Sequence, residues 1–182
     1  IYRLSGKKKG LVIRFLKEGG LINVNDPVIL TAGLDLRTVS LKTAHLNDCN
    51  FSHANFMDAE MNRVQLQNSL CFKTNFSGAD LTNADLRNAI LNRANLTRSS
   101  CSEANFTNAA LIKTNFTEAK LQKSVFFNAK LNGADFSAAN VCGARFDKTD
   151  VSGAKFEETI YDSTTKWPEG FDPEKAGLKR VE

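Results

Sequence analysis

The sequence lacks the features that mark membrane spans, metal sites and most enzymes. No apolar run reaches about 18 residues, so no segment is predicted to span a bilayer, and none has the pattern of a signal peptide. The two histidines, His45 and His53, stand alone, and no Cys/His spacing resembles a zinc site. There is no phosphate-binding glycine loop and no nucleophile–base pair. We therefore predict a protein that is not an enzyme and needs no cofactor or metal.

A strong charge of one sign is also missing from most of the chain. Residues 34–161 hold 14 basic and 13 acidic side chains, whereas residues 1–33 hold six basic and two acidic ones. The basic excess therefore belongs to the N-terminal segment, and the central part of the chain is nearly neutral.

What the sequence does have is a strict period of five. From Leu36 to Tyr161, 26 consecutive fifth positions are Leu, Phe, Met, Val, Cys or Tyr. We call these the large positions, and the residue two before each, mostly Ala, Ser, Thr, Cys or Val, is the small position. A period held without insertion predicts one structural unit copied along an axis, which is a solenoid.

Each five-residue unit is predicted to form one short strand and one corner. The small position, the residue after it and the large position read inward, outward and inward, as in a strand, and the next two residues must turn the chain. We call the outward residue the bridge position. Asn55, Asn75, Asn95 and Asn115 recur there at a spacing of 20, so their amides can stack along the axis, which favours four units per coil. Four units per coil would give an all-β solenoid of about 6.5 coils.

The repeated strings resemble a known family. Ser77–Leu81 (Ser-Gly-Ala-Asp-Leu) and Asn132–Phe136 (Asn-Gly-Ala-Asp-Phe) are similar to the A-(D/N)-L-x-x motif of pentapeptide-repeat proteins, and the resemblance covers about 70% of the chain. It implies a right-handed quadrilateral parallel β-helix with four repeats per coil. A looser resemblance, carried by residues 3–10 and 15–22, links the N-terminal segment to the leaders of cyanobacterial members, which often follow membrane-spanning segments.

We predict three segments: residues 1–33, a basic N-terminal segment with a capping α-helix; residues 34–161, the pentapeptide-repeat β-helix; and residues 162–182, a C-terminal cap and tail. An open solenoid end exposes its core and its strand edges, so both ends need a cover. Trp167 and Phe171 are expected to plug the core at the C-terminal end.

The N-terminal cover is expected to be a short amphipathic helix that ends at the glycine pair 19–20. Its apolar residues share one face at helical spacing, which we expect to lie on the core; they are Leu11, Val12, Phe15 and Leu16. A basic amphipathic helix can instead bind a membrane or a partner, and this is the alternative.

The repeated aspartates have a structural explanation. Asp80, Asp85 and Asp135 occupy the bridge position, where the family motif places Asp or Asn, so catalysis is not expected of them. The family resemblance also suggests a DNA mimic that regulates an enzyme such as DNA gyrase. Duplex DNA carries one negative charge per about 1.7 Å of its axis, and a nearly neutral solenoid does not match it. Direct binding of nucleic acid is not predicted either.

One group of outward residues has no role in the repeat itself. Four of them are apolar and are expected to form a contiguous patch over three coils, beside three basic residues. This candidate lateral surface consists of Leu70, Phe72, Lys73, Ile90, Arg93, Ile112 and Lys113. Val125 and Phe127, on the adjacent side, could extend it.

The lateral surface predicts a partner protein. Contiguous exposed apolar residues usually mark contacts, and closely spaced like charges repel unless a partner neutralises them. We hypothesise a partner surface that is apolar with an acidic rim. A self-contact, such as a homodimer, or plain tolerance of exposed apolar side chains is the alternative.

The sequence thus indicates a non-enzymatic protein-interaction scaffold. Because the chain begins at Ile1 rather than Met, we expect the soluble domain of a larger protein, attached to a membrane only through sequence upstream; a stand-alone scaffold is the second hypothesis. Cys71 and Cys101 at large positions and Cys49 at a small one are expected to be buried free thiols, with Cys142 facing outward. Free thiols favour a reducing, cytoplasmic location.

Overall fold

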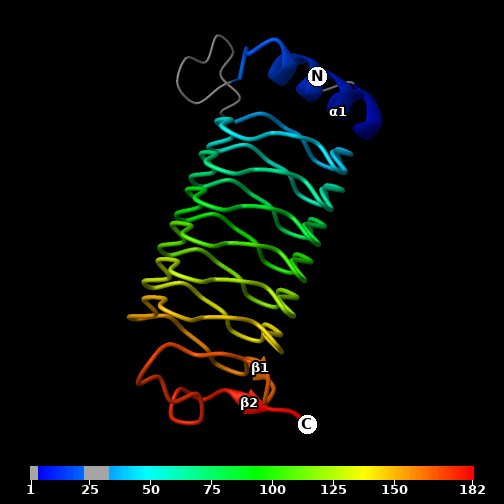
Figure 1. Ribbon diagram of the computed structural model, residues 1–182. Coiled ribbons are helices and arrows are strands. Elements are labelled where there is room, and N and C mark those ends of the chain that lie inside the picture. The colour runs from blue at the N-terminus through cyan, green and yellow to red at the C-terminus, as the bar shows by residue number, and fades with distance from the viewer. Residues whose placement is uncertain (1–3, 23–32) are drawn as a thin grey trace.

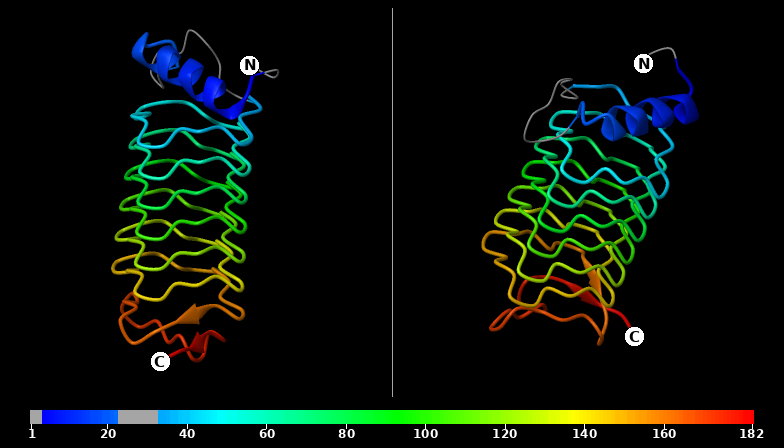
Figure 2. Two further views of the ribbon diagram at one scale, coloured as in Figure 1. Left: turned by 90° about the vertical axis from the view of Figure 1, so that its right-hand side faces the viewer. Right: turned by 45° about the horizontal axis from the view of Figure 1, so that its top comes forward.

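The computed structural model describes residues 4–22 and 33–182 and shows one helix followed by a stack of coils. Helix α1 (Gly6–Glu18) lies across one end of the stack, and two short strands, β1 (Ile160–Tyr161) and β2 (Lys179–Arg180), pair in parallel at the other (Figure 1). The two views of Figure 2 show the coils following one axis. Parts of the predicted N-terminal segment, residues 1–3 and 23–32, lie outside the described residues. Among residues 4–22 and 33–182, no helix combines the length and the hydropathy that a membrane crossing needs.

Each coil takes 20 residues, because the bridge positions pair in parallel with residues 20 further along. Leu70 pairs with Ile90, for example, and the carbonyl of Ile90 accepts the N–H of Cys71 at 2.8 Å. In the last coil Arg145 pairs with Lys166, so the spacing there lengthens to 21. The bridge residues of successive coils therefore stack into four columns that run along the axis.

The corners share one backbone conformation. The second turn residue has a positive φ at every corner from Gly33 to Glu158, which is the arrangement of a type II turn. Glycine and asparagine tolerate this conformation, but many corners hold other residues, such as Arg63 (φ 58°) and Ala138 (φ 56°). A left-handed conformation costs a residue other than glycine about 1–2 kcal/mol. Hydrogen bonds between coils offset this cost; the N–H of Ala138, for instance, donates to Glu157 O at 2.8 Å.

Large and small positions face the core, as the period of five predicts. Every large position from Leu36 to Phe146 is fully buried. Where a small position is Ser or Thr, its hydroxyl donates to a backbone carbonyl, as Thr74 Oγ1 does to Phe51 O at 2.8 Å. Because an unpaired buried hydroxyl costs about 1–3 kcal/mol, these bonds allow polar residues in an apolar column.

Stacked side chains run along the axis both inside and outside the solenoid. Inside, Phe126 lies parallel to Phe106 and Phe146, with its ring centroid 4.9 Å from each. Outside, the predicted asparagine ladder is confirmed where Asn75 Nδ2 donates to Asn55 Oδ1 at 3.1 Å. These ladders repeat with the coil, so each coil packs on its neighbours through the same contacts.

Our prediction for the contact face of the N-terminal helix was wrong for Leu11 and Phe15, although Leu16 does pack, partly buried, against the core. Leu11 and Phe15 are each 68% exposed, whereas Gly6, Gly10 and Ile13 face the solenoid. A Cβ at Gly6 would lie 2.1 Å from Thr38 O, and one at Gly10 would lie 2.1 Å from Ser40 O. The glycines let the helix backbone touch the first coil, and this close approach decides which face turns inward.

The two aromatic residues near the C-terminus pack on the last coil. Trp167 stacks on Phe146 with ring centroids 4.9 Å apart, and Phe171 meets Phe156 edge-on at 5.3 Å. These contacts agree with the expected position of both rings. The coil number of about 6.5, the segment boundaries and the roles of the two ends as caps stay predictions.

Candidate protein-interaction surface

The centre of the lateral surface is a pair of aliphatic side chains on adjacent coils. Leu70 and Ile90 are parallel bridge partners, so their side chains leave neighbouring strands on the same side. Leu70 is half-exposed, and Ile90, at 38%, is among the most exposed large apolar residues of the described chain. Ala110 and Lys130 continue the same column toward the C-terminus.

The flanking corner carries the other two apolar residues, but not side by side. Phe72 and Ile112 are both half-exposed and stand two coils apart, with Asn92 on the coil between them. The side-chain oxygen of Asn92 accepts the backbone N–H of Ile112 at 2.9 Å. The amide therefore bonds along the axis, toward the Ile112 coil.

The same corner carries the basic residues. Lys73, Arg93 and Lys113 are exposed, and within residues 4–22 and 33–182 none of them forms an ion pair. Lys73 Nζ lies 5.3 Å from the ring centroid of Phe72, a cation–π contact. By contrast, several arginines elsewhere on the solenoid hold a carboxylate; these are Arg37, Arg87, Arg98 and Arg145.

Sequence reasoning missed one neighbour of this surface. His53 precedes Lys73 in the stack of turn residues and meets Phe72 edge-on, with ring centroids 5.5 Å apart. The signal available in the sequence was the spacing of 20, which places His53 one coil before Lys73. Phe127, expected as an extension, stands at the opposite corner of the same side, with Lys148 Nζ 5.5 Å from its ring centroid.

The repeated aspartates have a structural role, as expected, and the structure shows that each accepts a hydrogen bond in the turn that follows it. Asp80 Oδ1 accepts the N–H of Thr82 at 3.0 Å, two residues further on. Burial alone would raise the pKa of Asp85, but the Arg87 guanidinium donates to its carboxylate at 2.7 and 2.9 Å and lowers that pKa below its ordinary value. The carboxylates are thus engaged with the backbone, and that of Asp85 is also engaged with Arg87.

The cysteines are free, and three of them are buried. Burial raises the pKa of Cys71 and Cys101 to about 12 and that of Cys49 to about 11. A thiol that stays protonated is a poor nucleophile and a poor metal ligand. In the part of the chain that the structure describes, no group of three His, Cys, Asp or Glu side chains could hold a metal ion.

Thiol labelling tests this burial pattern. At pH 8 we expect one thiol per folded chain, half-exposed Cys142, to give the rapid phase of reaction with a disulfide reagent, and the other three thiols to react only after unfolding. Burial also raises the pKa of Cys142, so this phase should be slower than that of a free thiol. Cys142→Ser should remove the rapid phase. Rapid reaction of a second thiol in the folded Cys142→Ser variant would contradict the pattern.

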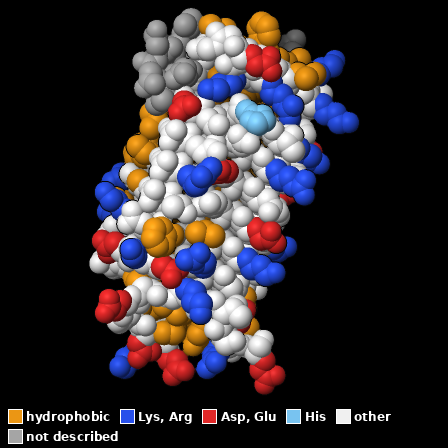
Figure 3. All heavy atoms as spheres, in the orientation of Figure 1, with side chains coloured by type: hydrophobic (Ala, Val, Ile, Leu, Met, Phe, Trp, Pro, Cys, Tyr) orange, Lys and Arg blue, Asp and Glu red, His pale blue; other side chains and the backbone are white. Residues whose placement is uncertain are grey.

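Charges of both signs are interspersed on the face of the solenoid that Figure 3 shows, with hydrophobic side chains among them. Several opposite charges pair across coils, such as Arg98 Nε with Glu118 Oε2 at 2.9 Å. This surface is not the dense array of negative charge that a DNA mimic needs.

Comparisons with known proteins agree with this geometry. The model of the family described as pentapeptide repeats matches the chain in eight copies, over residues 35–70, 73–98, 89–126, 99–137 and 124–160. A search of curated proteins found no match. Among solved structures, QnrB1, a plasmid-mediated fluoroquinolone resistance protein, is 18% identical with a TM-score of 0.51, covering 81% of this chain and 78% of that one.

Two cyanobacterial proteins from Nostoc are also similar. HetL, a pentapeptide repeat protein involved in heterocyst differentiation regulation, is 24% identical with a TM-score of 0.45, covering 84% of this chain and 78% of that one. The pentapeptide repeat protein alr5209 is 30% identical with a TM-score of 0.46, covering 67% of this chain and 84% of that one.

Proposed function

The chain belongs to the pentapeptide-repeat family, whose fold is a right-handed β-helical solenoid, and from this premise we propose that it is a non-enzymatic scaffold that binds a partner protein through its lateral surface. The observation that carries the proposal is the pair of half-exposed Leu70 and exposed Ile90 beside Lys73, Arg93 and Lys113, three basic side chains without carboxylate partners in the described chain.

The chemistry of the lateral surface defines its partner. Covering Ile90 and Leu70 removes apolar area from water and contributes about 25 cal/mol per Å². Acidic side chains at the edge of the partner would neutralise the basic corner and speed association. Phe72, which contacts His53 and Lys73, is an aromatic residue of the kind that anchors interfaces.

Helix α1 has a separate role in this proposal. It covers the first coil through Gly6, Gly10 and Ile13, and so shields the N-terminal edge of the solenoid from pairing with other chains. Its bond to the first coil, from Ser40 N–H to Gly6 O at 3.3 Å, supports this role.

Substitution of Ile90 tests the proposal against a matched control. We expect Ile90→Lys to reduce partner capture about tenfold or more, because the new ammonium group would lose its hydration in an apolar contact. Met57→Lys is the control, because Met57 (37% exposed) matches Ile90 (38%) in exposure but lies at a corner outside the lateral surface. Affinity capture quantified by mass spectrometry measures the effect, and circular dichroism checks folding.

The alternatives give different results in the same experiment. Equal capture by wild type, Ile90→Lys and Met57→Lys would show that the lateral surface has no role in binding. If Ile90→Lys instead shifts the chain from dimer to monomer in size-exclusion chromatography with light scattering, the surface is a self-contact.

A further inference from the structure

The C-terminal tail extends only some of the bridge columns. It adds Lys179 opposite Ile160 and Lys166 opposite Arg145, each in parallel register. The column that contains Leu70 and Ile90 instead ends at Asp150, which pairs with Lys130 on one side only.

Three backbone groups at this end lack the partners that their equivalents have. One coil earlier in this column, all three groups are paired. Ala129 O accepts the N–H of Asp150 at 3.3 Å. Leu131 N–H donates to Asp150 O at 2.9 Å, and Gly133 N–H donates to Ser152 O at 2.9 Å. The equivalent groups on the last coil are unpaired within residues 4–22 and 33–182; they are Thr149 O, Val151 N–H and Gly153 N–H. They form the edge of a parallel strand, with one acceptor and two donors.

A turn shifted by one residue explains why the chain does not fill this edge itself. With the spacing of 21 in the last coil, residue 171 would stand opposite Asp150. The turn instead begins one residue late. A regular turn would have residue 170 donate its N–H to Trp167 O, whereas here Phe171 N–H donates to Pro168 O at 3.2 Å. The Phe171 ring then packs on Trp167, with centroids 4.9 Å apart, and leaves the edge uncovered.

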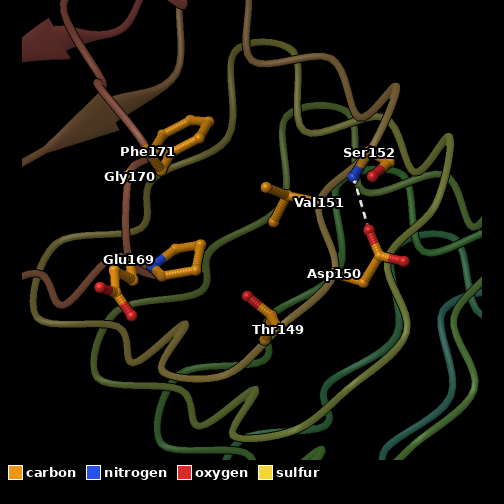
Figure 4. Close-up of a pocket in the computed structure, with 8 residues that line it drawn as sticks. Thr149, Asp150, Val151, Ser152, Glu169, Gly170 and Phe171 are labelled. Carbon is orange, nitrogen blue, oxygen red and sulfur yellow. Dashed lines mark hydrogen bonds between the residues drawn. The ribbon is translucent and has the colours of Figure 1, made fainter.

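The uncovered edge opens into a cleft of about 330 Å³. Thr149–Ser152 form one wall and Pro168–Phe171 the other, as Figure 4 shows. Val151 and Phe171 give the cleft apolar surface, and Asp150 and Glu169 give it acidic groups. Hydrogen bonds from Ser152 and Asn132 hold the pKa of Asp150 below its ordinary value, so this carboxylate is charged at neutral pH.

We propose that this cleft binds an extended peptide segment of a partner protein, which adds a parallel strand to the open edge. The peptide residue opposite Asp150 would donate its N–H to Thr149 O and accept from Val151 N–H. Charge selects Lys or Arg at this position, with a small residue before it and an apolar residue after it. The chain itself pairs such a triplet, Ala129–Leu131, with the Asp150 strand on the other side.

A short peptide tests strand addition directly. The probe is acetyl-Asn-Ala-Lys-Leu-Asn-amide, and its control carries an N-methyl group on the lysine nitrogen, which removes the N–H that would reach Thr149 O. We expect saturable downfield shifts of the Val151 and Gly153 amide protons in NMR titrations, and at least tenfold weaker binding of the methylated peptide. Trp167, the sole tryptophan, contacts Phe171 and gives a parallel fluorescence readout.

A charge exchange tests the selectivity. Asp150→Lys should weaken the lysine peptide at least fivefold and should favour the peptide with Glu in place of Lys. Binding that ignores both N-methylation and charge, or no saturable shift at millimolar peptide, would overturn the proposal. So would shifts that appear without peptide as protein concentration rises, because a second copy of the chain would then occupy the edge. Ile90→Lys should leave peptide binding unchanged, which separates this site from the lateral surface.

Discussion

Replacing Phe126 by alanine should lower the free energy of unfolding by about 3–5 kcal/mol. Phe126 is fully buried, stacks on Phe106 and Phe146 at 4.9 Å, and meets Phe116 and Phe136 edge-on at 5.8 and 5.7 Å. Alanine would leave a cavity in the middle of this stack of rings. The coils cannot close it easily, because their backbone spacing is fixed by the bridges above and below.

The next residue supplies the control. Phe127 is half-exposed at a corner, with Lys148 Nζ 5.5 Å from its ring centroid, so Phe127→Ala should cost about 1 kcal/mol or less. Urea unfolding followed by circular dichroism measures both. Equal losses for these adjacent phenylalanines would contradict the assignment of one to the core and the other to the surface.

The period of five was enough to predict the environments of these two phenylalanines. Phe126 falls at a large position, which faces the core. Phe127 falls one residue later, at a corner, which faces the solvent. The same count assigned Cys71 and Cys101 to the core and Asp80 to an outward bridge position. Such predictions succeed because every unit repeats the same backbone, so one pattern fixes the environment of many residues.

The ends of the solenoid could not be predicted in the same way, because they break the repeat. At the N-terminus, apolar periodicity favoured Leu11 and Phe15 as the buried face, yet backbone proximity decided the packing. The spacing of Gly6, Gly10 and Ile13 at one helical face was the signal that hydropathy alone overlooks. At the C-terminus, the cleft depends on a turn shifted by one residue at Pro168, which no repeat pattern encodes.

The lateral surface was predictable only in part. Sequence placed Leu70 and Ile90 in one column, and their pairing follows from the 20-residue coil. It did not show that the Asn92 side chain accepts the backbone N–H of Ile112, or that His53 packs against Phe72, because these contacts depend on side-chain directions at a corner. The apolar centre of the lateral surface therefore consists of Leu70 and Ile90 rather than of four adjacent apolar residues. Ile90 is the more exposed of the two, so its substitution should affect partner binding most.

Gly10→Ala should destabilise the chain by up to about 2 kcal/mol, although alanine is the better helix former. In an isolated helix this substitution would stabilise by about 1 kcal/mol. Here the added Cβ would lie 2.1 Å from Ser40 O, so α1 must move away from the first coil, and overpacking of this kind costs about 1–3 kcal/mol or more. The sign of the effect therefore distinguishes a docked helix from a free one.

Limited trypsin digestion should show where the stability is lost. We expect Gly10→Ala to speed cleavage after Arg14 about tenfold, because an undocked helix exposes its backbone, while the coils remain resistant. Gly19→Ala is the matched control, since the nearest atom to its Cβ, Phe15 O, lies at an ordinary 3.4 Å and its φ of −75° suits alanine. A stabilised, trypsin-resistant Gly10→Ala variant would mean that α1 does not rest on the first coil. We explain the outward position of Leu11 and Phe15 by the two glycines, which hold the opposite face of the helix against the solenoid. That result would therefore remove the explanation.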